Sequence, residues 1–69
     1  MLKVDKTKLD RRLQLATMTY TDLASAAGLR LATVSKLANG HTVPRAATLR
    51  KITQALKCEP ADILEEVQP

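Results

Sequence analysis

The sequence predicts an all-α fold, with five short helices in a single domain that spans residues 1–69. Three observations support this prediction. The chain contains one tyrosine and no phenylalanine or tryptophan, so its core must be aliphatic, which suits packed helices better than strands. Apolar residues recur at helical spacing. Glycine and proline divide the chain into short segments, and 69 residues leave no room for a second core.

The first helix is expected over residues 6–17. Asp5 suits the N-cap position, where a carboxylate accepts hydrogen bonds from the first turn. Residues 1–5 are expected to form an N-terminal arm, and either a frayed end or a short extended piece is compatible with its sequence. The inner face of the helix carries apolar residues at i, i+4 and i+7, which are Leu9, Leu13 and Ala16.

The second helix is expected to begin at Thr19, because the Thr19 hydroxyl and the Asp22 carboxylate have the spacing of a capping box. Gly28 suits the left-handed backbone position that ends a helix. The third helix is expected over residues 31–39 and stops at Gly40. Residues 41–45 then form a loop, because proline disfavours helix at the residue before it.

The fourth helix is expected over residues 46–57. The fifth is expected to begin at Pro60, because proline is favoured at the first helical position, and residues 66–69 are a C-terminal tail. The apolar contacts of this fifth helix are Ile63, Leu64 and Val67. The predicted core of the domain is Leu9, Leu13, Leu23, Leu29, Val34, Leu37, Leu49, Ile52 and Leu56.

Charge is unevenly distributed along the chain, whose formal net charge is +4. Residues 1–58 hold all 11 lysines and arginines against three aspartates, a net charge of +8. Residues 59–69 hold four acidic residues and no basic one, a net charge of −4. A basic body with an acidic tail indicates a polyanionic partner, although a solvated surface explains the charge alone equally well.

Several classes of protein are not expected. No apolar run approaches the roughly 20 residues that span a bilayer, and no signal peptide is visible, so the cytoplasm is the expected location. Cys58 is the only cysteine and is expected to pack as a buried thiol. His41 has no second ligand at metal-binding spacing. Because there is also no catalytic triad, acid/base pair or glycine-rich phosphate loop, we expect no enzyme, no metal, no cofactor and no small-molecule ligand.

Residues 27–30 are a short glycine-containing turn between two short helices, which is the pattern of a helix-turn-helix. At about 100° per residue, Val34 and Leu37 share one side of the third helix, flanked by Arg30 and Thr33. A face of small residues can enter a major groove about 12 Å wide, while an ordinary solvated face is the alternative. The opposite side, with Leu31 at its edge, carries Ala32, Ser35, Lys36 and Asn39.

Two segments resemble the Cro and phage-repressor (Xre-like) family, in its compact single-domain subgroup. They are MTYTDLASAAGLRLATVSKLANG and KITQALKCEPADIL, which lie within residues 18–64 and so within about 47 of the 69 residues. The resemblance implies a lambda-repressor-like helix-turn-helix fold. It also implies a regulator of transcription, by expectation a repressor, that binds duplex DNA sequence-specifically with helix 31–39 in the major groove. A homodimer is expected, because one module of this size reads few base pairs.

The resemblance also assigns positions that contact DNA. Leu31, Ala32 and Lys36 match base-reading positions of the family, whereas Thr33 and Asn39 match positions that bind phosphates. The full set of expected DNA-binding residues is Tyr20, Arg30, Leu31, Ala32, Thr33, Ser35, Lys36, Asn39, His41, Thr42 and Arg45.

The chain departs from the family's pattern at several of these positions. Tyr20 stands where relatives usually have a phosphate-contacting glutamine. Arg30 replaces a capping serine or threonine; it cannot cap, but it can pair with a phosphate. His41, Thr42 and Arg45 lie in a loop that in relatives approaches the DNA backbone or the minor groove.

The leading edge of the third helix is apolar, and two explanations fit it. Leu31 and Ala32 can contact thymine methyl groups, with Lys36 as the polar reader of guanine. Alternatively, the protein reads bases poorly and depends on phosphates and DNA shape.

Three further points stay open at the level of sequence. The basic stretch of residues 3–12 either flanks a duplex or is a solvated face. The dimer surface is expected at the fifth helix and its neighbouring loops, because Ile63, Leu64 and Val67 are apolar residues near the end of the chain. The alternative function is a protein-interaction module, such as an antitoxin or adaptor with the same fold, whose binding would show little of the salt dependence of direct DNA binding.

Overall fold

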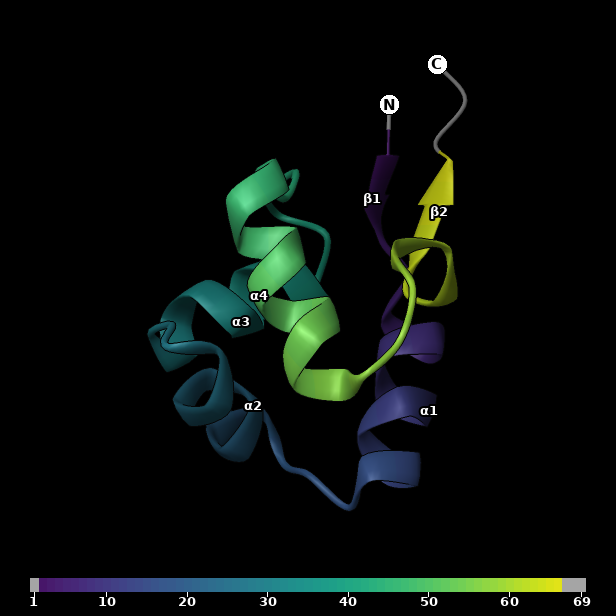
Figure 1. Ribbon diagram of the computed structural model, residues 1–69. Coiled ribbons are helices and arrows are strands. Elements are labelled where there is room, and N and C mark those ends of the chain that lie inside the picture. Colours follow the sequence, from purple (N-terminus) through teal and green to yellow (C-terminus); the bar gives the residue numbers. More distant parts are fainter. Residues whose placement is uncertain (1, 67–69) are drawn as a thin grey trace.

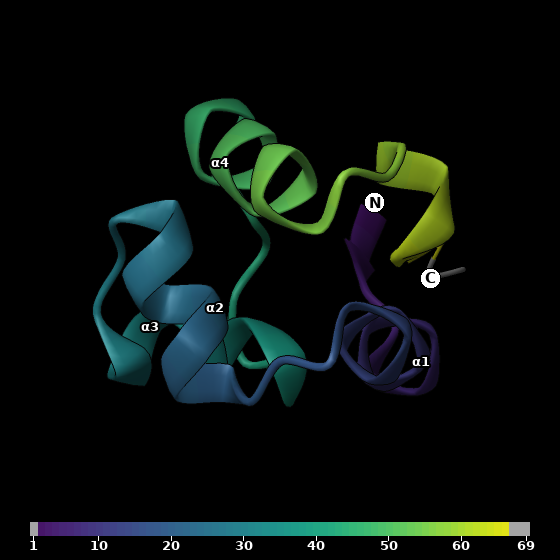
Figure 2. The same cartoon turned by 60° about the horizontal axis from the view of Figure 1, so that its bottom comes forward.

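The computed structural model describes residues 2–66, and Met1 and residues 67–69 lie outside this part. Within it the chain forms four α-helices, one 3-10 turn and a two-stranded sheet. Figures 1 and 2 show α2 and α3 together on one side, α1 and the sheet on the other, and α4 between them. The elements are β1 (Leu2–Val4), α1 (Lys6–Ala16), α2 (Tyr20–Ala27), α3 (Leu31–Ala38), α4 (Ala46–Leu56), η1 (Pro60–Asp62) and β2 (Leu64–Glu66).

The first two helices begin at the N-cap residues that the sequence predicts, Asp5 and Thr19. The Asp5 carboxylate accepts from the backbone N–H groups of Thr7 and Lys8, at 2.9 and 3.2 Å. At α2, Asp22 N–H donates to the Thr19 hydroxyl at 3.1 Å, and Thr19 N–H donates to the Asp22 carboxylate at 2.9 Å. The capping box is therefore confirmed, and these bonds satisfy amides that a helix start leaves unpaired.

Helix ends are less uniform than the sequence suggests. Gly28 ends α2 in the left-handed region, with φ of 68°, and Gly40 follows α3 with φ of 74°. Both positions agree with the prediction. Thr17 and Lys57 end α1 and α4 in the same left-handed conformation, each with φ of 54°. Neither residue type signals this conformation, which non-glycine residues adopt at a cost.

The core forms where the helices meet, with α2 packed against both α3 and α4. Seven of the nine predicted core residues are buried. The other two, Leu29 and Leu49, are half-buried against the cluster, as is Cys58, whose thiol pKa is raised by burial and by the nearby Asp62 carboxylate. The buried apolar residues are Val4, Leu9, Leu13, Leu23, Ala24, Ala27, Val34, Leu37, Ala38, Ile52, Leu56, Ile63 and Leu64.

The predicted fifth helix is replaced by a 3-10 turn and a strand, and the all-α class is confirmed only in part, because residues 2–66 are mostly helical but include a small two-stranded sheet. Pro60 does open a helical turn, in which Glu59 N–H donates to the Asp62 carboxylate at 2.9 Å. The turn ends at Ile63, whose φ of −128° leaves the helical region. A segment this short has little stability as an isolated helix, whereas as a strand it forms backbone hydrogen bonds with a partner strand.

That partner is the N-terminal segment, so the extended alternative is right for residues 2–4. β1 and β2 pair antiparallel, with Leu2 opposite Glu66, Lys3 opposite Glu65 and Val4 opposite Leu64. Asp5 N–H continues the ladder by donating to Ile63 O at 2.8 Å.

The new strand also corrects the expected dimer surface. Ile63 is 0% exposed and Leu64 is 9% exposed, so both side chains belong to the core of their own chain. Val67, the third residue of that expected surface, lies outside the described residues.

Candidate nucleic-acid interface

α3 divides into an inner and an outer side, as its periodicity predicts. Val34, Leu37 and Ala38 are 1%, 3% and 1% exposed and face the core. Leu31 is 48% exposed. The outer side of α3 is therefore available to a partner along its length, and it carries no long acidic side chain. Ser35 on this side is half-buried. The exposed residues on it are Leu31, Ala32, Lys36 and the C-cap residue Asn39.

All of the predicted DNA-binding residues lie at the surface. Tyr20, Thr33 and Ser35 are half-buried. The exposed members of the set are Arg30, Leu31, Ala32, Lys36, Asn39, His41, Thr42 and Arg45. They lie along α3 from its N-cap to its C-cap, in the loop that follows it, and at the start of α2.

The N-terminal end of α3 has no side-chain cap. Arg30 occupies the N-cap position and makes no capping hydrogen bond, while its carbonyl accepts from the N–H groups of Thr33 and Val34 at 3.0 and 3.2 Å. The N–H groups of Leu31 and Ala32 precede the first intrahelical bond. An exposed guanidinium beside these amides makes a positive end that suits a phosphate.

At the other end of α3, Asn39 is already engaged within the protein. Its side-chain amide donates to Ser35 O at 2.9 Å, and its Oδ1 accepts from Lys6 Nζ at 3.4 Å. Lys3 lies beside the next residue, since a Cβ built on Gly40 would lie 3.4 Å from Lys3 Nζ. Lys3 and Lys6, which belong to the basic stretch with two possible roles, therefore lie together at this end of α3.

The loop after α3 folds back along the helix. His41 N–H donates to Lys36 O at 2.9 Å. A shallow hollow of about 290 Å³ separates the loop from α3. This arrangement brings two predicted residues, Thr42 and Arg45, close to Thr33. The same hollow is also lined by Val43, Pro44 and Thr48, which sequence reasoning missed because no motif points to them. The hollow is lined by Thr33, Leu37, Thr42, Val43, Pro44, Arg45 and Thr48.

Tyr20 opens α2 and points toward α1. Its hydroxyl donates to the Asp10 carboxylate at 3.0 Å. Partial burial and this carboxylate raise the pKa of Tyr20, so the phenol is neutral at physiological pH. The hydroxyl is held in place by α1, and to donate to a DNA phosphate it would first have to release Asp10.

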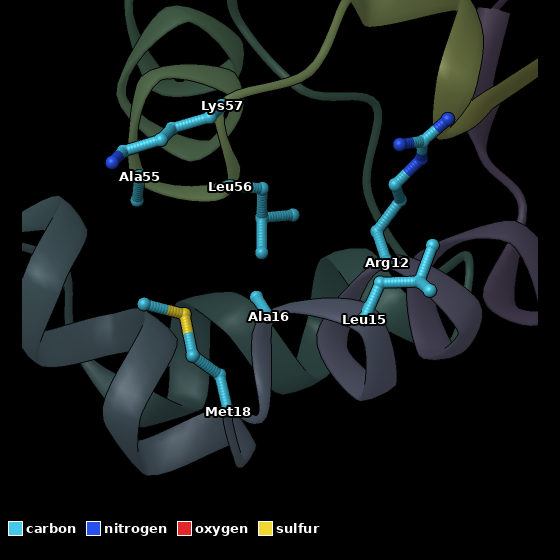
Figure 3. A pocket seen from close by; sticks show the side chains of 7 residues that line it. All are labelled: Arg12, Leu15, Ala16, Met18, Ala55, Leu56 and Lys57. Carbon is cyan, nitrogen blue, oxygen red and sulfur yellow. The ribbon is translucent and has the colours of Figure 1, made fainter.

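A second hollow lies away from these residues, between the C-terminal ends of α1 and α4 (Figure 3). Its volume is about 360 Å³. Leu15 at its edge is 66% exposed. Figure 3 shows Leu56 directed toward Ala16, with Arg12 and Lys57 directed away from each other. None of the predicted DNA-binding residues lines it; its lining is Arg12, Leu15, Ala16, Met18, Ala55, Leu56 and Lys57.

Among residues 2–66, no three or more His, Cys, Asp and Glu side chains are grouped so that they could hold a metal ion. In the same stretch, no helix has the length and apolar character needed to cross a membrane.

Three known proteins resemble this chain in sequence or in structure. The chain is 40% identical over 58 residues to the uncharacterized HTH-type transcriptional regulator YozG of Bacillus subtilis (strain 168), an overlap that covers 83% of this chain and 69% of that protein. A candidate DNA-binding protein from Bacteroides fragilis has a similar structure, with a TM-score of 0.75 and 20% identity over 94% of this chain and 100% of that one. Native PhpD with cadmium atoms gives a TM-score of 0.78 and 22% identity over 97% of this chain. This chain spans only 14% of the PhpD chain, and both structural likenesses concern the fold alone.

The family comparison covers almost the whole sequence. The model of the Cro/C1-type HTH DNA-binding domain matches residues 8–69, which include the capped helix α2, the glycine turn and α3. The chain therefore belongs to the Cro/C1-type helix-turn-helix DNA-binding domain family.

Proposed function

We propose that the protein is a sequence-specific, double-stranded-DNA-binding regulator of transcription that places α3 in the major groove. The observation that carries this proposal is the outer side of α3. Ala32, Ser35 and Lys36 present small or single-charge side chains there, while Val34 and Leu37 hold the helix on the core. The transcriptional regulator from Bacillus subtilis to which the chain is similar supports the regulatory part of the proposal.

The dimensions of α3 suit this placement. Its eight residues extend about 12 Å at about 1.5 Å per residue, which equals the approximate width of the major groove. With the N-terminal end leading, Leu31 and Ala32 meet base edges first and contact thymine methyl groups. Lys36 follows just over one turn later, within reach of a guanine edge. Arg30 and Thr33 then lie toward the flanking phosphates, with Thr42 and Arg45 beside them.

We further propose that the protein acts as a homodimeric repressor in the cytoplasm. Two copies related by a two-fold axis would read half-sites about 34–36 Å apart. The interface between the copies must lie outside Ile63 and Leu64, which are buried within each chain. A compact domain seated on a promoter excludes other proteins from the same DNA, which is the physical basis of the proposed repression.

Selection of bound sequences from a random duplex pool tests this function. We expect enrichment of a palindromic site with half-sites one helical turn apart, and an affinity for that site that falls steeply as salt is raised. Enrichment of a single half-site would reject the dimer but keep the DNA-binding function. No retention of duplex at low salt would reject DNA binding and favour the protein-interaction alternative.

A further inference from the structure

Four of the five basic residues in the stretch 3–12 fall into two groups in the structure. Lys8 Nζ donates to Leu64 O at 2.9 Å, and Arg12 forms an ion pair with Asp62 at 3.3 Å. These two side chains therefore hold α1 against the η1–β2 segment. Lys3 and Lys6 lie instead at the C-terminal end of α3, beside Gly40 and Asn39.

We propose that Lys3 and Lys6 form a second phosphate-contacting patch, which places the sheet end of the domain against one DNA backbone. This inference rests on the proposed function, because it assumes that α3 occupies the major groove. It adds to that function a pair of residues far from the helix-turn-helix in sequence.

The position of the patch follows from the length of α3. Because the helix is about 12 Å long and the major groove is about 8.5 Å deep, a helix that enters with its N-terminal end against the bases has its C-terminal end near the edge of the groove. Phosphates line that edge. Lys6 Nζ is anchored there by Asn39 Oδ1 at 3.4 Å, and Lys36 and His41 are exposed at the same end of the helix.

The charges around the patch hold the two lysines in place and also oppose a phosphate in part. The C-terminal end of a helix carries a partial negative charge, which holds cations in place. The carboxylate of Asp5, the nearest acid in sequence, accepts hydrogen bonds from the first turn of α1. Glu65 lies opposite Lys3 in the sheet register, and it is the acid that most directly weakens the patch. Ammonium groups without a buried partner are suited to act as point charges toward phosphates.

Salt titration of duplex binding tests the patch. The test variant is Lys3→Gln/Lys6→Gln, and the control is Arg11→Gln/Lys57→Gln, which removes the same charge. Arg11 lines a hollow beside η1, and Lys57 lines the hollow in Figure 3. The test variant should lower the slope of log Kobs against log salt by about 1.8, at about 0.9 per phosphate contact. Between 50 and 200 mM salt, its affinity should fall roughly tenfold less than that of the unmodified protein.

The outcomes separate the patch from the proposed function. The control should keep the original slope, and Lys3→Arg/Lys6→Arg should restore it, because the charge is retained. The loss in the test variant should be the same for selected and random duplexes, since phosphates carry no sequence information. Equal slopes in test and control variants would overturn the patch while leaving the DNA-binding function intact. An unmodified protein without salt-dependent duplex binding would overturn both.

Discussion

Shortening Ile63 to valine removes one methylene from the centre of the core, where Ile63 is 0% exposed. Such a substitution costs about 0.5–1.5 kcal/mol. In a domain of this size, each 1 kcal/mol lowers the melting temperature by about 4–8 °C, so Ile63→Val should melt about 2–12 °C lower. At about 0.05–0.15 kcal/mol per residue, the unmodified chain has enough stability for the variant to stay folded at 25 °C.

Thermal unfolding followed by circular dichroism at two protein concentrations makes this measurement decisive. A core residue predicts the same drop at both concentrations. A residue of a dimer interface predicts a drop that depends on protein concentration, because association stabilises by mass action. Leu15→Ala is the matched control, since Leu15 is 66% exposed and its loss should change stability by less than about 0.5 kcal/mol. An unchanged melting temperature for Ile63→Val, or a drop seen at one concentration only, would refute the placement of this segment in the core.

The other predictions concern the starts of α2 and α3 and the outer side of α3. Hydrogen bonds from Thr19 lower the pKa of Asp22. The stabilisation by the Asp22 carboxylate is therefore fully present above its pKa in the unfolded chain, near pH 4. It is lost as the pH falls through the lower pKa of the folded protein. The melting temperature should then fall more steeply in acid than that of Asp22→Asn, and parallel curves would contradict this. Arg30→Ser should supply the missing cap of α3 and raise the free energy of unfolding by about 1 kcal/mol, measured in urea, while lowering the salt slope of DNA binding by about 0.9; a variant that gains stability with an unchanged slope would remove Arg30 from the phosphate contacts. Lys36→Ala should weaken binding to the selected duplex by about 1–3 kcal/mol and to random duplex by less, in a competition assay. An equal loss on both duplexes would place Lys36 on a phosphate.

The helix-turn-helix could be predicted from the sequence because its signals are local. Thr19–Asp22 and Gly28 fix the start and end of α2 within a few residues of chain. The spacing of Val34 and Leu37 likewise indicates the inner side of α3, and both are buried. The exposed positions of Leu31, Ala32 and Lys36 follow from the same period, while their contacts with DNA stay predictions.

The sheet and the lysine patch depend on pairing between distant parts of the chain. Pro60 begins a helical turn as predicted, but Ile63 and Leu64 leave it because Val4 and Asp5 provide a ladder about 60 residues away in sequence. No local pattern contains that information. Lys6 and Asn39 are 33 residues apart, so the position of Lys6 beside α3 could not be deduced from a helical period either.

The β1–β2 pair joins the first described residues to the last, and this has a consequence for the order of folding. Contacts between distant residues carry a large loop-closure entropy and form late. Two short helices such as α2 and α3 gain little in isolation, and without Leu64 the strand β1 has no partner strand to hold Lys3 beside Gly40. The position of Lys3 beside Gly40 would therefore be among the last features of the surface to form, and a C-terminally shortened chain would lack it.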